Sequence, residues 1–268
     1  MLKSGYWQDL TTDQFQAVDP ERTLAVLPLA AVEQHGPHLP LCTDAVINEG
    51  IVAGALARVP EGLRVWVLPA STIGHSLEHT AFAGTLSASA ESLLGLWVDV
   101  ARGVTRAGVR KLILLNSHGG QTSLVDLAAV RLRAELGMLA VRAHYFRFGA
   151  PAGLFDDREL AFGIHGGEVE TSLMLHLRPE LVRLEALREF DGLPARMAGE
   201  NQVLGVEGPA GIGWMSQDLN RDGVCGHAAR ADASRGAVLL EHIVARFVRL
   251  LAEVAATPLA RLRPGPFD

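Results

Sequence analysis

A run of residue types that bind metals follows the first apolar segment of the chain. The run spans residues 33–44 and reads EQHGPHLPLCTD, which places Glu33, His35, His38 and Asp44 close together in sequence. Carboxylates and neutral imidazoles suit zinc and manganese, and a carboxylate can bridge two divalent ions. A solvated surface loop would have no reason to concentrate such groups. The run therefore indicates a metal site.

The spacing within this run suggests how its side chains converge. Glu33 and His35 alternate, so on an extended segment they point the same way. Asp44 returns after a Gly-Pro turn. Cys42 lies in the same run, and we interpret it as a small buried neighbour of the metal loop, because no base is required to activate it.

Three further blocks carry polar residues of the same kinds. They read GHSLEH at 74–79 with FAGT at 82–85, NSHGGQ at 116–121, and HGGEVETS at 165–172. Together with the run at 33–44, and in this order, they resemble the creatininase family of metal-dependent amide hydrolases. The resemblance implies a site for two divalent ions, Zn and/or Mn, with Fe as a further candidate.

The resemblance also implies a ligand set. Asp44 would bridge the ions, with Glu33 and His118 on one ion and His35 on the other. In creatininase itself the last acidic ligand follows the third-block histidine, where this chain has Gly119-Gly120. Other family members use the glutamate of a His-x-Gly-Glu block. By that match, Glu168 is expected to be the remaining ligand of the second ion.

Two residues of the last block are candidates for catalysis. His165 matches the histidine proposed as general acid in the family, and an imidazole pKa near 6.5 suits proton transfer near neutral pH. A structural role outside the ligand shell is the alternative for His165. Glu170 could support the ligands through hydrogen bonds, or it could be a helix-start carboxylate favoured by the helix dipole.

Other polar residues have less defined roles. His38 is expected to contact the site from outside the ligand shell. Glu78 and His79 either shape the pocket wall or form a hydrogen-bonded structural pair. Packing or surface roles are favoured for His144, His176 and His242.

The elements that must position these residues follow from hydrophobic periodicity. Strands are predicted at 23–29, 64–69, 111–116 and 139–145, and helices at 44–59, 90–107, 122–136, 168–177 and 231–255. Alternating strands and helices favour an α/β fold, with a mostly parallel sheet covered by helices on both faces. In such a sheet, sites form at the carboxyl ends of the strands. The Gly-rich segment 200–234 could hold a substrate loop.

Composition limits the class of protein. With 268 residues and 49% hydrophobic residues, the chain fits one α/β domain over 1–268. A net charge of −6 without basic runs argues against nucleic-acid binding. No apolar stretch predicts a signal peptide or a membrane span, and only two cysteines occur, so a cytoplasmic location is expected. The resemblance implies a homo-oligomer, a hexamer.

The function favoured by these residues is hydrolysis of a C–N amide bond in a small molecule by metal-activated water. A cyclic amide, a formamide and a small linear amide are all compatible substrates. By our alignment, Phe146 and Ala161 stand where creatininase has two tryptophans, which argues against creatinine itself. The alternatives are a family peptidase of redox-cofactor maturation and a non-catalytic binding protein on the same scaffold.

Overall fold

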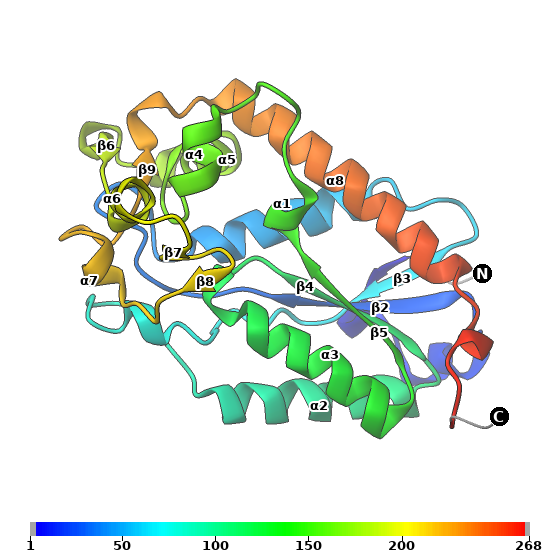
Figure 1. Ribbon diagram of the computed structural model, residues 1–268. Coiled ribbons are helices and arrows are strands. Elements are labelled where there is room, and N and C mark those ends of the chain that lie inside the picture. Colours follow the sequence, from blue (N-terminus) through cyan, green and yellow to red (C-terminus); the bar gives the residue numbers. More distant parts are fainter. Residues whose placement is uncertain (1–3, 266–268) are drawn as a thin grey trace.

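The computed structural model describes residues 4–265, which build a central five-stranded parallel sheet (Figure 1). The strand order is β1-β3-β2-β4-β5. Every neighbouring pair in this sheet is parallel. The bounds are Gly5–Tyr6 for β1, Thr23–Leu29 for β2, Arg64–Val67 for β3, Lys111–Asn116 for β4 and Leu139–His144 for β5.

Helices cover both faces of this sheet. The bounds are Thr43–Leu56 (α1), Ala90–Arg106 (α2), Thr122–Leu136 (α3), Asp157–Phe162 (α4), Glu168–Leu177 (α5), Leu193–Glu200 (α6), Ser216–Leu219 (α7) and Ala233–Ala256 (α8). Helices α2 and α3 pack on one face, and α1, α5 and α8 on the other (Figure 1). Side chains of β2 alternate between the two cores, with Val26 in one and Ala25 in the other. The predicted α/β architecture is confirmed.

Short elements complete the chain around the carboxyl end of the sheet. Strand β6 (Glu189–Phe190) pairs antiparallel with β9 (Gly226–His227), and β7 (Leu204–Gly205) pairs parallel with β8 (Ala210–Gly211). Short 3-10 helices occur at Trp7–Asp9 (η1), Thr12–Ala17 (η2), Leu77–His79 (η3), Gly119–Gln121 (η4), Tyr145–Phe148 (η5), Pro179–Leu181 (η6), Leu184–Ala186 (η7), Ala228–Arg230 (η8) and Leu259–Arg261 (η9).

Most predicted elements lie where the periodicity placed them. Strands β2 and β4 and helices α3 and α5 have the predicted bounds. Helix α1 ends at Leu56 rather than Val59, because Pro60 disfavours helical geometry at the residue before it. The short elements β1, α4, α6 and α7 were not predicted. A signal existed for α4, whose N-cap Asp156 accepts a hydrogen bond from the backbone N–H of Glu159.

The loops that carry the polar blocks leave the same edge of the sheet. Because all the strands of the central sheet are parallel, the segments after β2, β3 and β4 meet at their carboxyl ends. Across residues 4–265, every helix is too short or too polar to cross a membrane.

Candidate metal centre

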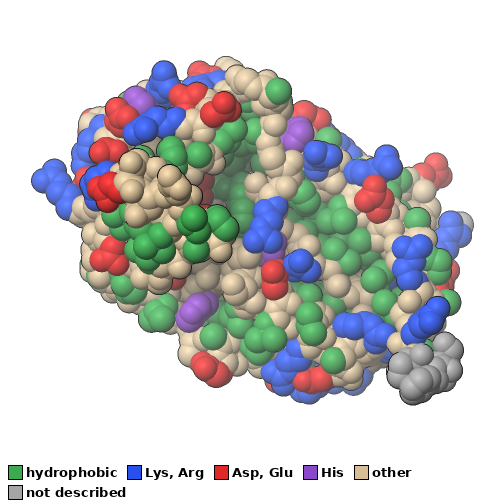
Figure 2. All heavy atoms as spheres, in the orientation of Figure 1, with side chains coloured by type: hydrophobic (Ala, Val, Ile, Leu, Met, Phe, Trp, Pro, Cys, Tyr) green, Lys and Arg blue, Asp and Glu red, His purple; other side chains and the backbone are tan. Residues whose placement is uncertain are grey.

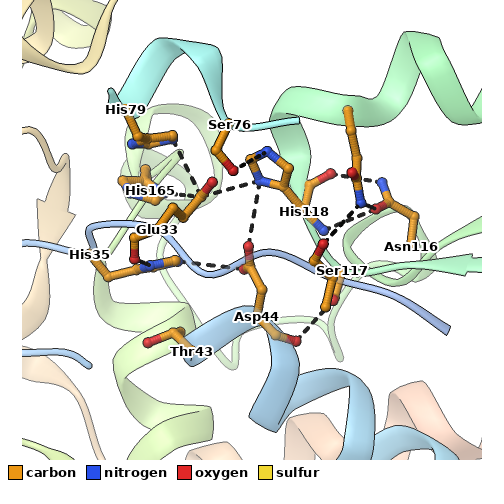
Figure 3. A network of polar contacts seen from close by, with 12 residues as sticks. Glu33, His35, Thr43, Asp44, Ser76, His79, Asn116, Ser117, His118 and His165 are labelled. Carbon is orange, nitrogen blue, oxygen red and sulfur yellow. Dashed lines mark hydrogen bonds and ion pairs between the residues drawn. The ribbon is translucent and has the colours of Figure 1, made fainter. Parts of the chain in front are cut away.

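Four side chains from the segments after β2 and β4 form a buried line of carboxylates and imidazoles (Figure 3). Glu33 Oε1 lies 3.1 Å from His118 Nδ1, which lies 3.4 Å from Asp44 Oδ2. On the other side of Asp44, Oδ1 lies 3.5 Å from His35 Nε2. All four side chains are at most 2% exposed. The structure thus brings together the first four residues of the expected ligand set.

Asp44 is placed to serve two ions. Its two carboxylate oxygens face different imidazoles, one belonging to His118 and the other to His35. Glu33 Oε2, His35 Nε2 and Asp44 Oδ2 are buried without a hydrogen-bond partner among the residues described. Buried polar atoms without partners cost free energy, and divalent ions at these atoms would remove that cost. The donor set of carboxylates and imidazoles fits zinc or manganese.

Hydrogen bonds to backbone carbonyls orient both imidazoles. His35 Nδ1 lies 3.1 Å from the carbonyl oxygen of Glu33, and His118 Nε2 lies 2.9 Å from that of His75. Each of these nitrogens therefore carries a proton and donates to the carbonyl. His35 Nε2 and His118 Nδ1 face the carboxylates and are the nitrogens that would bind an ion once deprotonated, which is the arrangement that metal-ligating histidines use.

The charges in this metal-free cluster shift the pKa values of both imidazoles. Burial alone would lower the pKa of His118, but the carboxylates of Glu33 and Asp44 outweigh it and raise the pKa to about 10. Burial would also lower the pKa of His35, but the carboxylates of Asp44 and Glu170 outweigh it and raise the pKa to about 9. Burial raises the pKa of Asp44. Burial also opposes the charge of Glu33, but the neighbouring imidazoles of His118 and His79 outweigh it and hold the pKa of Glu33 well below its usual range.

The two acidic residues of the last block, Glu168 and Glu170, lie in different surroundings. Glu168 is buried, but its Oε1 accepts a hydrogen bond from the guanidinium of Arg235 on α8. Glu170 instead has Oε2 3.9 Å from His35 Nε2, and it forms a possible metal-binding group with His35 and His165. The structure therefore directs Glu170, rather than Glu168, toward the cluster.

His165 lies between the two halves of the cluster. Its Nε2 lies 2.7 Å from the carbonyl oxygen of Gln34, so this nitrogen donates and Nδ1 remains an acceptor. Nδ1 lies 4.0 Å from Glu33 Oε1, and the side chain lines the cavity described below. Burial, together with the neighbouring rings of His35 and His79, lowers the pKa of His165 well below its usual value.

His79 belongs to the centre, although the sequence favoured no single role for it. Its Nε2 lies 3.3 Å from Glu33 Oε1. On the far side, Nδ1 is contacted by Gln34 Nε2 at 2.9 Å and by the Ser216 hydroxyl at 2.7 Å. The amide of Gln34 can only donate there, so Nδ1 accepts and the Nε2 proton faces Glu33. The sequence feature that pointed to this role was the position of His79, an imidazole at the end of the polar block at 74–79.

Asn116 holds the backbone of His118 from both sides (Figure 3). Its Oδ1 accepts from the His118 N–H at 3.1 Å, and its Nδ2 donates to the His118 carbonyl at 2.7 Å. The same Nδ2 lies 3.0 Å from His144 Nδ1, while His144 Nε2 lies 3.0 Å from Asp126. His144, for which a packing or surface role is expected, thus connects Asn116 to the carboxylate of Asp126.

His38 and His242 contact backbone carbonyls away from the cluster. The His38 ring is buried, and its Nε2 lies 3.0 Å from both the carbonyl of Gly166 and the hydroxyl of Thr171. This places His38 behind the loop that carries His165. His242 Nε2 lies 3.2 Å from the carbonyl of Phe148.

A cavity of about 760 Å³ opens above the cluster. Glu33, Asp44, His118 and His165 line its floor. Figure 2 shows the molecule hollowed on this face, with hydrophobic side chains around the hollow. The apolar wall residues include Phe146, Leu160, Ile164, Ile212, Trp214 and Met215.

The aromatic wall differs from the one that the alignment suggested. Phe146 lines the cavity as expected, but Ala161 is not among the wall residues in the described part of the chain. Trp214 supplies an indole from the segment 200–234 and meets the His79 ring edge-on, with ring centroids 6.5 Å apart. This contact supports a substrate-facing role for that segment.

Comparison with known proteins places this site in a family. The family model described as creatinine amidohydrolase matches residues 8–251. The chain belongs to the creatininase family of amidohydrolases. Its members hydrolyse C–N amide bonds, so this chain is a creatininase-family hydrolase.

Similar proteins include a peptidase and a creatinine amidohydrolase. The chain is 32% identical to the mycofactocin precursor peptide peptidase of Mycobacterium tuberculosis over 254 residues, covering 92% of this chain and 91% of that protein. It is 31% identical to the creatinine amidohydrolase of Pseudomonas putida over 212 residues, covering 73% and 79%.

Solved structures of creatininases share the fold. A crystal structure of a putative creatinine amidohydrolase from Bacteroides fragilis superposes with a TM-score of 0.77 at 24% identity, covering 97% of this chain and 99% of that chain. A manganese form of creatininase superposes with a TM-score of 0.74 at 23% identity, covering 95% and 100%.

Proposed function

We propose that this creatininase-family protein is a dinuclear metal-dependent amidohydrolase that cleaves a C–N amide bond in a small molecule. The observation that carries the proposal is the position of Asp44, whose two oxygens face His118 and His35 beneath the cavity. Glu33 and His118 would hold one ion, His35 and Glu170 the other, with Asp44 between them. Glu170 replaces Glu168 in this assignment because Glu168 is bonded to Arg235.

The ions and the residues would divide the chemistry. Two divalent ions supply an activated water and a positive charge that polarises the amide carbonyl. His165 holds Nδ1 as a proton acceptor beside Glu33, since its Nε2 is engaged by the Gln34 carbonyl. It would take a proton at Nδ1 when water adds to the amide carbon, and it would deliver that proton to the leaving nitrogen. The apolar walls limit access of bulk water.

A peptide substrate is the second candidate. The similarity to the mycobacterial peptidases covers nine-tenths of the chain, and a cavity of about 760 Å³ exceeds what one small ring requires. In that case a short peptide would lie along Phe146 and Trp214. A non-catalytic binding protein is disfavoured because the cavity reaches the carboxylates and imidazoles directly.

An activity screen with defined metal content tests this proposal. The purified protein, with its metals measured by mass spectrometry, would be assayed with formamides, lactams, linear amides and short peptides, with and without added Zn or Mn. We expect about two ions per chain and metal-dependent release of an amine. Asp44→Ala should lose both ions and all turnover.

Two results would contradict the proposal. Retention of one ion at full affinity in Asp44→Ala would show that this carboxylate does not bridge. Full metal loading without turnover of any amide class would favour the binding-protein alternative. The homo-oligomeric state and the cytoplasmic location remain predictions.

A further inference from the structure

One carboxylate in the cavity wall has no role in the centre described above. Glu78 lies in η3, after strand β3, and its side chain is 13% exposed. Its Oε1 lies 3.7 Å from His118 Nε2 and 3.8 Å from His79 Nε2. Both nitrogens have nearer acceptors, the carbonyl of His75 at 2.9 Å and Glu33 at 3.3 Å. Glu78 thus presents a carboxylate to the cavity with free acceptor capacity.

Gly120 makes the room for this carboxylate. A Cβ atom built on Gly120 would lie 1.5 Å from Glu78 Oε1, whereas a Cβ on the neighbouring Gly119 would meet nothing within 4 Å. Any side chain at position 120 would therefore displace the carboxylate of Glu78. The carboxylate of Glu78 can occupy this position only because Gly120 has no side chain.

Glu78 lies on the far side of His118 from the proposed ions. His118 turns Nδ1 toward Glu33 and Asp44, at 3.1 and 3.4 Å, and Nε2 toward Glu78, at 3.7 Å. The described wall of the cavity contains no lysine or arginine, but it contains two further carboxylates outside the cluster, Glu159 and Glu207. Both oxygens of Glu159 accept hydrogen bonds from backbone N–H groups, whereas Glu207 lies on the segment between β7 and β8. The cavity therefore combines apolar walls with negative charge.

We propose that Glu78 is a specificity-determining residue that accepts hydrogen bonds from a cationic N–H group of the substrate, such as an ammonium or amidinium group. This inference rests on the proposed function, because it assigns a substrate class to the same site. The partner of such a carboxylate must donate hydrogen bonds, and a positive charge strengthens each of them. A neutral group of the same size loses that part of the binding.

Binding of two matched benzamides tests this directly. The probes are 4-(aminomethyl)benzamide, which is a cation at neutral pH, and 4-(hydroxymethyl)benzamide, which is neutral and of nearly equal size. The rigid ring keeps the amine from chelating the ion that its own amide contacts. Calorimetric titration of the Mn-loaded protein should show about tenfold tighter binding of the cation, as expected for a charge-assisted hydrogen bond.

Three variants distinguish a direct contact with Glu78 from a general attraction of cations to the negative charge of the cavity. Glu78→Gln should remove the preference for the cation while leaving the metal content unchanged. Gly120→Ala should also remove the preference, but its Cβ would lie 2.9 Å from His118 Cε1, so its metal content is measured alongside. Glu207→Gln removes a second wall carboxylate and should keep the preference. Equal binding of both probes by the wild type, or an unchanged preference in Glu78→Gln, would overturn the inference. Loss of metal in Glu78→Gln would also overturn it, because Glu78 would then be a ligand.

Affinity for the probes and release of ammonia from them are separate readouts on the same loaded protein, so the two proposals fail separately. A loaded protein that hydrolyses no amide counts against the proposed function. A charge preference that survives Glu78→Gln counts against the role of Glu78 alone.

Discussion

At the residue scale, the least expected feature is that Glu170, and not Glu168, points toward His35. Both lie in the first turn of α5, two positions apart. Successive helical residues are rotated by about 100°, so these two side chains point to nearly opposite sides of the helix. Glu168 meets Arg235 of α8, and Glu170 meets His35 of the metal loop. The block HGGEVETS alone could not distinguish them.

Paired amide substitutions on α5 test this difference. Glu170→Gln should lower the metal content to about one ion per chain, because the amide is a poor ligand. Glu168→Gln should keep both ions but lower the free energy of unfolding by about 1–3 kcal/mol, since Arg235 loses a charged partner. Metal analysis and urea unfolding measure both effects. The opposite pattern of metal loss would restore Glu168 as the ligand.

His165 provides a second prediction at this scale. His165→Ala should keep both ions and lower turnover by roughly 10²–10⁴-fold, the usual range for losing general acid–base assistance. His242→Ala removes an imidazole that contacts only the Phe148 carbonyl and serves as the control. Metal analysis of both variants accompanies the kinetics. If His165→Ala loses an ion, His165 is a ligand.

At the scale of elements, close contact between α5 and α8 positions the loop that carries His165. Gly236 of α8 lies against the backbone of α5, and a Cβ there would be 1.9 Å from the carbonyl oxygen of Ser172. The backbone N–H of Asp232, the N-cap of α8, also donates a hydrogen bond to the Ser172 hydroxyl. Any separation of the two helices would shift the start of α5, where Glu168 and Glu170 lie.

Alanine substitutions at two helical glycines test this packing. Gly236→Ala should destabilise the fold by about 1–3 kcal/mol, because the backbone of α5 cannot yield to the added methyl group. Gly95→Ala on α2 places its methyl group where nothing lies within 4 Å, so it should be neutral or stabilise by up to about 1 kcal/mol. Thermal unfolding compares them. Equal effects would show that the helix contact is loose.

At the scale of the whole molecule, metal binding should be linked to both stability and pH. Without metal, His35 and His118 have pKa values of about 9 and about 10, so both are protonated at neutral pH. Because these pKa values exceed the unfolded value of about 6.5, the protonated imidazoles stabilise the metal-free fold below that pH. This contribution is lost as the pH rises toward 9 and 10. Metal binding at neutral pH must release these protons.

The metal-dependent rise in the melting temperature should therefore grow from pH 6 to pH 8 at a fixed concentration of free metal. Each displaced proton strengthens apparent binding about tenfold per pH unit, which is about 1.4 kcal/mol. Scanning calorimetry with and without buffered Mn measures the difference, and Asp44→Ala provides the control without metal. A rise that is independent of pH would contradict protonation of His35 and His118 in the metal-free protein.

The sequence by itself determined the framework of this protein. Residues 24–29 and 112–115 form unbroken apolar runs, which predict parallel strands buried on both faces, and they lie within β2 and β4. Parallel strands place their following loops at one edge, so Glu33, His35, Asp44 and His118 could be expected to meet from their positions alone.

Only the tertiary structure decided which other side chains reach that edge. The rotation of α5 depends on its packing against α8, and this rotation turns Glu170 toward His35 and Glu168 toward Arg235. The indole of Trp214 reaches the cavity because its loop folds over it, and the carboxylate of Glu78 fits there because Gly120 leaves space for it. Local patterns record which face of a helix is apolar, whereas contacts between distant segments decide where each polar side chain points.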